Sequence, residues 1–286
     1  ADTRTSGACW PYPMFAGLVI AESPRGAVSM WMTDRELMPR YMHWRNNAGR
    51  LDLVFESLNH APYNDNKTVR SRTIRVNVYQ GNWVTAARPF RDHWEKTFGV
   101  KPLNERQPEW LENIRGVMSG YGTPPREHID KIMVWAPQRW KVQPKVGDGG
   151  LFPYDIEKGP ELYMIKGNRR EERRLGVHRM VYLNINHMNR GHPWAHKFWQ
   201  HRIRPVFKEP DQAPVPKAGS KGSFNVHCAY RPWQDLIIDW ARQSYDRFGI
   251  RGYYMDCASG KPNTATGLIR GLNDAQGQVE LMKRMR

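Results

Sequence analysis

The sequence has 286 residues, of which 40% are hydrophobic and 12% aromatic, and its formal net charge at pH 7 is +16. This length and hydrophobic content exclude a disordered chain and predict one or two globular domains with a buried core. Because no run of about 18 apolar residues occurs, we expect no membrane-spanning helix.

Short apolar or β-branched runs dominate the first 80 residues and predict β-strands. They are separated by Gly, Pro, Asn and Asp, and they cover residues 18–20, 27–33, 51–58 and 73–79. The last run alternates polar and apolar residues, as a strand with one buried face does. We therefore predict an antiparallel sheet over residues 1–80, as a portion of a β-sandwich.

A helical segment follows the predicted sheet. Gly81-Asn82-Trp83 interrupts the strand pattern, and residues 84–98 place apolar side chains on one helical face before Gly99, a residue typical of helix ends. Residues 101–108 are polar and contain two prolines, which indicates a boundary. We predict a helical linker over residues 81–108.

From residue 109 to residue 286, short apolar runs alternate with helical stretches, which predicts crossover units and a parallel sheet. The expected strands are 114–118, 132–135, 180–184 and 252–255, and the expected helices are 160–175, 192–201 and 233–248. We predict the first half of a (β/α)8 TIM-type barrel here, so that the whole chain is α/β with an all-β N-terminal part. The connection between the first two strands is short for a helical crossover and fits this prediction least. Residues 208–222 are expected to form a long loop.

One stretch of the predicted barrel has the features of a catalytic position. Residues 233–248 form an amphipathic helix with Pro232 at its start and Gly249 after its end, and the strand over 252–255 then leads to Asp256. Catalytic groups of α/β barrels lie at the carboxyl ends of the strands. We therefore predict Asp256 as a catalytic carboxylate; the alternative is that it caps the segment that follows.

Polar residues at alternate positions accompany Asp256. Tyr254 precedes it by two residues, and Tyr182, Asn184 and Asn186 alternate along the preceding predicted strand. Polar side chains toward the carboxyl end of a strand are typical of the lining of a site above a barrel. We predict these four residues as substrate-binding, with a polar loop that begins one residue earlier as the alternative.

Four aromatic residues fall in or after the loops that would follow the predicted strands. They are Trp135, Trp140, Tyr154 and Trp194. Aromatic faces stack well against the C–H faces of sugar rings, so the set predicts carbohydrate subsites. For each residue taken alone, packing in the core or in a loop is the alternative.

Histidine and cysteine spacing does not predict a metal site. His192 and His196 are four residues apart, but no third ligand or carboxylate accompanies them. Cys9, Cys228 and Cys257 lie far apart in sequence; they could form one disulfide, and the sequence does not decide whether they do. No phosphate-binding glycine loop or dinucleotide fingerprint occurs, so we expect neither a metal nor a cofactor.

The positive net charge raises the question of nucleic acid as a partner. One arginine cluster, at residues 169–174, is interleaved with Glu171 and Glu172 and is typical of a solvated helix face. No zinc-finger, helix-turn-helix or RNA-recognition signature occurs, and we do not expect nucleic acid as the partner.

Two sets of residues resemble known glycoside hydrolases. Residues 249–256, Gly-Ile-Arg-Gly-Tyr-Tyr-Met-Asp, follow a helix that starts near Trp233 and resemble the fourth-strand region of retaining α-glycosidases, in which the fourth-strand Asp is the nucleophile. Residues 81–83, 86–94 and 108–111 are similar to the linker and barrel entry of a poorly characterised, glycoside-hydrolase-like bacterial family in which a β-sandwich precedes the barrel. The resemblance spans most of the chain. It implies Asp256 as the nucleophile and a secreted or cell-surface location, which the residues themselves leave open.

These observations predict a glycoside hydrolase of the retaining kind, with an oligo- or polysaccharide as substrate. Glycoside hydrolysis usually needs a second carboxyl group, and Asp155, Glu157 and Asp274 do not sit at predicted strand ends. The sequence stops inside a predicted helix over 280–286, so we expect an inactive fragment whose second acid lies on a later strand. The alternatives are a non-catalytic carbohydrate-binding protein on the same fold and a basic module that binds nucleic acid or another polyanion.

Overall fold

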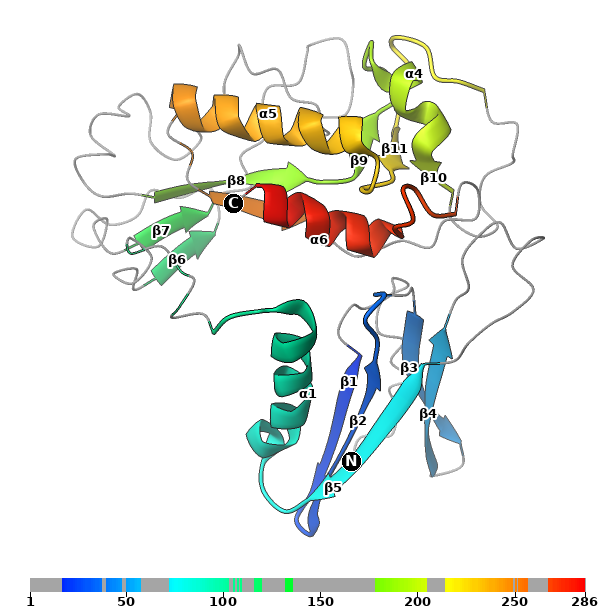
Figure 1. The fold of residues 1–286 in the computed structure, drawn as a ribbon, viewed down its shortest axis with the longest axis vertical. Helices are drawn as coiled ribbons and strands as arrows, with labels where there is room; N and C mark the ends of the chain where they lie inside the picture. The colour runs from blue at the N-terminus through cyan, green and yellow to red at the C-terminus, as the bar shows by residue number, and fades with distance from the viewer. Residues whose placement is uncertain are drawn as a thin grey trace. The chain divides into compact units, whose positions relative to one another are not determined.

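The structure is a computed structural model, and its elements form a mixed α/β fold (Figure 1). It describes residues 17–37, 40–47, 50–57, 72–102, 105, 107, 109, 116–119, 132–135, 178–204, 214–248, 250, 252–256 and 267–285. The chain divides into two compact units. Unit 1 comprises Ala1–Arg106, Arg204–Lys208 and Ser259–Gln276, and unit 2 comprises Gln107–Ile203, Glu209–Ala258 and Gly277–Arg286.

Unit 1 contains two antiparallel sheets. Strands β1 (Leu18–Ser23), β2 (Gly26–Thr33) and β5 (Thr73–Tyr79) form one sheet in the order β1-β2-β5, and β3 (Arg40–Asn47) pairs with β4 (Arg50–Ser57) in the other. The predicted antiparallel strands are confirmed. The sequence did not predict β3, because its residues, Arg-Tyr-Met-His-Trp-Arg-Asn-Asn, show no alternation of polar and apolar side chains.

Helix α1 (Trp83–Phe98) follows β5, close to its predicted bounds. The side chain of Asn82 accepts hydrogen bonds from the backbone N–H groups of Val84 at 3.1 Å and Thr85 at 3.3 Å, which caps the first turn. Gly99 ends the helix in the left-handed region, at φ 63°. Pro89 lies inside α1, where it cannot donate a backbone hydrogen bond.

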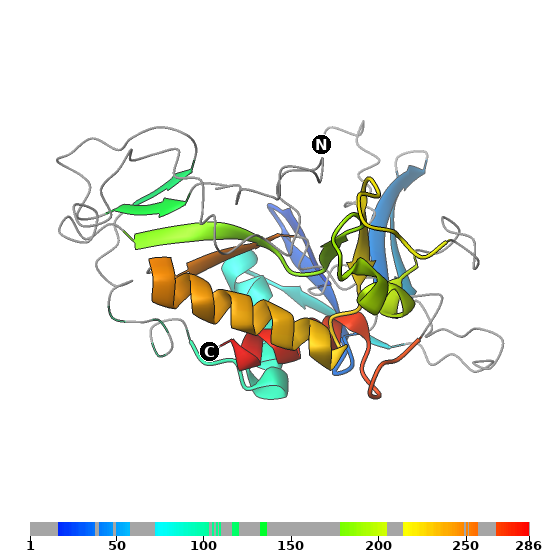
Figure 2. The same cartoon turned by 90° about the horizontal axis from the view of Figure 1, so that it is seen from above.

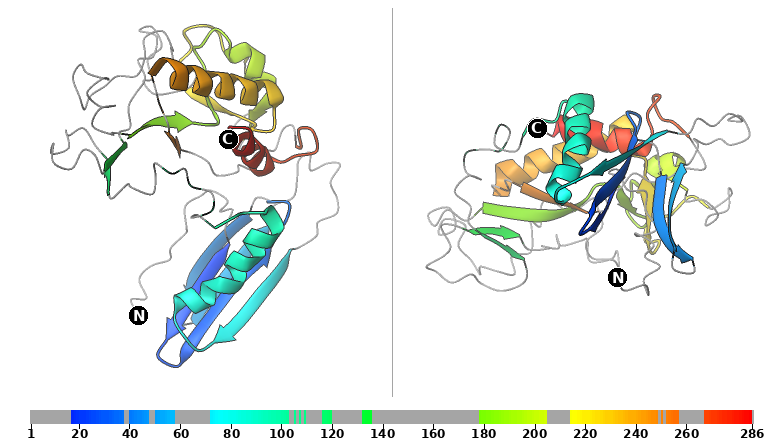
Figure 3. Two further views of the ribbon diagram at one scale, coloured as in Figure 1. Left: turned by 60° about the vertical axis from the view of Figure 1, so that its left-hand side comes forward. Right: turned by 90° about the horizontal axis from the view of Figure 1, so that it is seen from below.

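Helix α1 packs against a face of its sheet (Figure 3). The buried Trp31 of β2 contacts the helix there. The ring centroid of Trp31 lies 5.7 Å from that of Phe90 and 5.0 Å from that of His93, both on α1. Tyr79 of β5 donates a hydrogen bond from its hydroxyl group to the backbone oxygen of the buried Ala86, at 3.3 Å. These contacts join the helix to the face of the sheet.

Unit 2 is built on a parallel sheet of four strands. They are β6 (Gly116–Ser119), β7 (Ile132–Trp135), β8 (His178–Asn184) and β12 (Gly252–Asp256), in the order β12-β8-β7-β6. The predicted parallel strands are confirmed, and the short connection between β6 and β7 does join two parallel neighbours. Spatial order therefore follows chain order along the sheet.

Helix α5 (Arg231–Phe248) lies beside β8, as Figures 1 and 2 both show, and packs the core of unit 2. Its fully buried Trp233 donates a hydrogen bond from the indole nitrogen to the backbone oxygen of Ile185, at 2.9 Å. Other buried side chains of this core include Leu183, Ile237, Trp240 and Ile250. The strong amphipathic pattern that predicted this helix thus corresponds to its buried face.

Helix α6 (Asp274–Arg284) contacts the start of α5 through its residues from 277 onward. Gln234 of α5 donates hydrogen bonds to the backbone oxygens of Cys228 at 2.8 Å and Gly277 at 3.3 Å. Gly277 has no room for a side chain, because a Cβ there would lie 2.6 Å from the Cα of Ala229. The sequence predicted a helix only from residue 280.

The connection between β8 and α5 forms a small antiparallel sheet that the sequence did not predict. Its strands are β9 (His187–Asn189), β10 (Arg202–Ile203) and β11 (Ser223–Val226), in the order β10-β11-β9, with a short α4 (Ala195–Phe198) and a 3-10 helix (Trp199–His201) between β9 and β10.

The predicted helix over 192–201 is therefore wrong for its first residues. The side chains of Asn189 and His192 accept hydrogen bonds from the nearby backbone N–H groups of Gly191 and Trp194, which competes with helix formation. The predicted helix over 160–175 lies outside the described residues.

Candidate functional site

Asp256 and Asn184 lie side by side at the carboxyl ends of two adjacent parallel strands. The register of β12 on β8 pairs Asp256 with Asn184 and, two residues earlier, Tyr254 with Tyr182. Neighbouring residues of paired parallel strands share a face of the sheet, so these four positions belong to one face. The predicted association of Tyr182, Asn184 and Tyr254 with Asp256 thus agrees with the backbone register.

The opposite face of these strands packs against α5. Leu183 is fully buried, and Tyr253 donates a hydrogen bond from its hydroxyl group to the backbone oxygen of Ala241 on α5, at 2.8 Å. Because successive strand residues alternate between faces, the positions of Asn184 and Asp256 belong to the face away from α5. In barrels, the face away from the helices is the one that leads to the site at the carboxyl ends.

Asn184 and Asn186 are buried, with exposed fractions of 3% and 0%. The backbone oxygen of Asn186 accepts a hydrogen bond from the backbone N–H of Val226 at 2.6 Å, which joins the end of β8 to the end of β11. A side chain with no exposed surface does not reach a ligand in this state. Asn186 is therefore placed to hold the strand end.

Of the four predicted aromatic platforms, Trp135 lies away from Asp256 along the sheet. Trp135 is paired with Met180, which in turn is paired with Gly252 at the amino end of β12. Gly252 precedes Asp256 by four residues, or about 13 Å along a strand. Trp140 and Tyr154 lie outside the described residues.

Trp194 has an exposed ring that its neighbours hold in place. It is 44% exposed, and its centroid lies 5.2 Å from that of His192 in an edge-on contact. The backbone N–H of Trp194 also donates to Nδ1 of His192, at 3.1 Å. Burial lowers the pKa of His192, so its ring is neutral at pH 7 and can accept this bond. An exposed, immobilised aromatic face is what a sugar platform needs.

This part of unit 2 carries several basic side chains that the sequence patterns did not single out. Residues 178–204 and 214–234 contain no Asp or Glu, whereas they include Arg190, Lys197, Lys217 and Lys221. The signal that could have found them is the local excess of basic residues, since Glu209 and Asp211 are the acids between residues 178 and 234.

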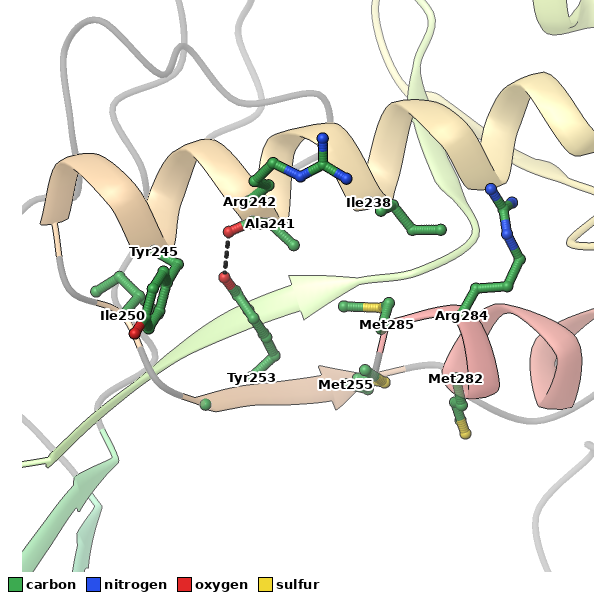
Figure 4. Close-up of a pocket in the computed structure, with 11 residues that line it drawn as sticks. Ile238, Ala241, Arg242, Tyr245, Ile250, Tyr253, Met255, Met282, Arg284 and Met285 are labelled. Carbon is green, nitrogen blue, oxygen red and sulfur yellow. Dashed lines mark hydrogen bonds between the residues drawn. The ribbon is translucent and has the colours of Figure 1, made fainter. Parts of the chain in front are cut away.

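A cavity of about 850 Å³ lies on the other side of the sheet, between α5, β12 and α6 (Figure 4). Its apolar lining includes Ile238, Ala241, Ile250, Met255, Met282 and Met285, and its charged lining consists of Arg242 and Arg284. Because Tyr253 and Met255 face it, the positions of Tyr254 and Asp256 alternate away from it. The cavity is therefore separate from the strand-end site.

Metal, disulfide and membrane features add little to the site. Among the described residues, no three His, Cys, Asp or Glu side chains gather closely enough to hold a metal ion. Cys228 is a buried thiol 3.7 Å from the backbone oxygen of Ile185, and Cys9 and Cys257 lie outside the described residues. No helix in the described part of the chain is long and apolar enough to cross a membrane.

Comparison with known proteins gives structural but no sequence matches. No protein-family model and no curated protein sequence matches the chain. The α-N-acetylgalactosaminidase NagBb from Bifidobacterium bifidum, free of ligand, matches with a TM-score of 0.58 at 10% identity, over 95% of this chain and 50% of that chain. Its complex with Gal-NHAc-DNJ matches with a TM-score of 0.58 at 11% identity, over 97% of this chain and 50% of that chain.

The structural neighbours are thus glycosidases, and at this identity the likeness is one of fold alone. The chain spans about half the length of the solved structures that it matches.

Proposed function

We propose that the chain is part of a glycoside hydrolase of the retaining kind, with Asp256 as the nucleophile or stabilising carboxylate and an oligo- or polysaccharide as substrate. The observation that carries the proposal is the pairing of Asp256 with Asn184 at the carboxyl ends of adjacent parallel strands. This is the edge at which α/β barrels present their catalytic groups. The glycosidase fold of the neighbours supports the same proposal.

The order of the parallel strands supports half of a (β/α)8 barrel as the architecture. A barrel adds each new parallel strand beside the preceding one, whereas a doubly wound sheet reverses its order at a switch point. The order β6-β7-β8-β12 has no reversal. We therefore assign residues 1–80 to a β-sandwich portion, 81–108 to a helical linker and 109–286 to a partial barrel.

The other site residues take different roles in this proposal. Tyr182, Asn184 and Tyr254 share a face with Asp256 and line the substrate site beside it. Trp194 acts as a sugar platform, and Asn186 holds the end of β8. Trp135, Trp140 and Tyr154 are proposed as further sugar subsites.

The mechanism requires a second carboxyl group. In a retaining glycosidase one carboxylate attacks the anomeric carbon, and a second residue first protonates the leaving oxygen and then deprotonates water. The other described strands of the parallel sheet end at Ser119, Trp135 and Asn184, which are not acids. We propose that a strand outside this chain supplies the acid, in keeping with the half-length match.

The test is Asp256→Asn in the whole protein that contains this chain. Hydrolysis of aryl glycosides should fall by roughly three orders of magnitude or more, because the nucleophile is lost while binding contacts remain. Asp246→Asn, which removes an exposed carboxylate from α5, is the matched control and should leave the rate unchanged. Near-normal turnover of the Asp256 variant would remove Asp256 from the mechanism.

A non-catalytic carbohydrate-binding protein is the second candidate. The absence of an acid from the three other described strand ends favours it, since hydrolysis usually needs two carboxyl groups. This alternative predicts saccharide binding that survives Asp256→Asn and no hydrolysis by the whole protein.

A further inference from the structure

The connection between β8 and α5 carries an excess of positive charge: residues 185–230 contain seven Arg or Lys and two acids, Glu209 and Asp211, which lie outside the described residues. Its described residues, 185–204 and 214–230, contain arginines and lysines but no Asp or Glu. Burial lowers the pKa of His192 and His201, so these two rings are neutral at pH 7. An excess of charge of one sign gives a surface a potential that attracts ions of the other sign.

Backbone pairing brings the basic residues of two separate segments together. The backbone N–H of Arg190 donates to the oxygen of Gly222 at 2.9 Å, and that of Gly219 donates to the oxygen of Gly191 at 3.1 Å. The turn that carries the exposed Lys217 and Lys221 therefore lies against the turn that carries Arg190. A Cβ at Gly222 would lie 3.8 Å from Cδ of Arg190, so the Arg190 side chain runs along this turn.

An aromatic ring orients two guanidinium groups beside these turns. Cζ of Arg190 lies 5.1 Å and Cζ of Arg202 4.1 Å from the ring centroid of the buried Trp199. Nη1 of Arg202 also donates to the backbone oxygen of Trp199, at 3.0 Å. The half-buried Arg190, held against this ring, loses little freedom when its guanidinium binds a planar carboxylate or a sulfate through two hydrogen bonds.

The same connection combines an ammonium group with the exposed ring of Trp194. Nζ of the exposed Lys197 lies 5.9 Å from the centroid of Trp194. A sugar stacked on Trp194 would thus place its substituents near a cation. An aromatic platform with adjacent cations fits a saccharide that carries negative groups better than it fits a neutral one.

We propose that this connection binds an anionic saccharide, so that the substrate of the proposed glycosidase carries carboxylate or sulfate groups. The inference deepens the proposed function and rests on it for the reaction, while the binding itself is independent of Asp256. A saccharide is favoured over nucleic acid because the connection follows Asn184 directly at the end of β8 and its described residues offer one exposed aromatic ring, Trp194. Single-stranded nucleic acids are bound on platforms for successive bases.

The test measures binding by the whole protein that contains this chain, with four defined probes. Polygalacturonate carries carboxylates, dextran sulfate carries sulfates, dextran is neutral, and oligodeoxythymidylate is an anion without exposed sugar faces of this kind. At about 0.15 M salt, at least one anionic polysaccharide should bind on the order of tenfold or more tightly than dextran and oligodeoxythymidylate, since charge-assisted hydrogen bonds are added.

Variants locate the binding on the connection. Arg190→Gln with Lys221→Gln should weaken binding of the preferred polysaccharide by about tenfold or more, because each removes a cation from the site. Arg25→Gln with Lys101→Gln removes the same charge from exposed positions of unit 1 and should change binding less than about twofold. Trp194→Ala should weaken binding of the polysaccharide as well.

Three outcomes would overturn the inference. They are equal binding of dextran, tighter binding of oligodeoxythymidylate than of both anionic polysaccharides, and an equal loss of affinity in the two paired variants. This test measures binding and not hydrolysis. If no anionic polysaccharide binds preferentially but neutral glycosides are still hydrolysed, the inference fails and the proposed function stands. If the whole protein binds the anionic polysaccharide but Asp256→Asn hydrolyses glycosides at the normal rate, the proposed role of Asp256 fails and the binding inference stands.

Discussion

At the scale of single residues, Tyr253 links strand β12 to helix α5. Its hydroxyl group donates to the backbone oxygen of Ala241 at 2.8 Å and lies 2.5 Å from Oγ of Ser244. Burial raises the pKa of Tyr253 to about 12, while the hydrogen bond with Ser244 acts in the opposite direction. The folded state therefore holds the phenol proton more tightly than the unfolded state does.

This difference predicts how the stability of unit 2 depends on pH. The contribution of Tyr253 is fully present below its unfolded pKa of about 10 and is lost as the pH rises toward 12. Tyr253→Phe should cost about 1 kcal/mol at pH 8, because the hydrogen bond to Ala241 is lost. In urea denaturation, the difference in the free energy of unfolding between the two proteins should narrow as the pH rises from 10 to 12.

The two proteins differ in the single hydroxyl group of residue 253, so the comparison isolates Tyr253. If the difference in the free energy of unfolding stayed constant over this pH range, Tyr253 would have the same pKa in the folded and unfolded states.

At the scale of elements, the contact between α6 and the segment before α5 depends on Gly277. Alanine is the better helix former by about 1 kcal/mol, so Gly277→Ala would stabilise an isolated helix. In the fold, the added Cβ meets backbone atoms of Cys228 and Ala229, which cannot move as a flexible side chain can. We expect a net loss of about 2 kcal/mol or more in the free energy of unfolding.

Lys283→Ala is the matched control for this prediction, because Lys283 is exposed on the same helix. It should shift the urea midpoint little, whereas Gly277→Ala should lower it clearly. A Gly277→Ala variant as stable as the parent protein would mean that α6 does not pack this closely.

The sequence predicts an element well when residues close together in the chain determine it, and poorly when pairing with distant residues does. Helix α5 was predictable, because its buried residues recur at helical spacing and Gly249 marks its end. The strand that leads to Asp256 was predictable for the same reason. The small sheet β9-β11-β10 was not, because strands as short as Arg202–Ile203 exist only through pairing with residues more than twenty positions away.

The pairing register of the strands explains the remaining differences between the predicted site and the site in the structure. The sequence indicated that Tyr182, Asn184, Tyr254 and Asp256 alternate within their strands, but only strand pairing places Asp256 beside Asn184. Pairing likewise sets Trp135 level with Met180, well before the carboxyl end of β12. The burial of Asn186 results from β11, an element that the sequence did not reveal.

At the scale of the whole molecule, the division into two compact units predicts two unfolding events. Each unit has its own elements and packing, with Trp31 central in unit 1 and Trp233 in unit 2. Asn82→Ala removes the cap of α1 and should cost about 1 kcal/mol in unit 1 alone. Calorimetry should then show one transition lowered and the other unchanged.

Asn82→Asp keeps an oxygen acceptor at the cap and is the control, and it should leave both transitions in place. Gly277→Ala should lower the temperature of the other transition, that of unit 2, which Asn82→Ala leaves unchanged. If each variant shifted a single common transition, the two units would unfold as one cooperative body.

The cavity between α5, β12 and α6 has a chemical consequence of its own. Met255, Met282 and Met285 together line it, and a thioether gains a polar oxygen when it is oxidised to the sulfoxide. Peroxide would thus turn an apolar contact between a strand and two helices into a polar one, without touching the carboxylates or the basic connection. Oxidation of these methionines should therefore weaken the packing of unit 2 around the cavity.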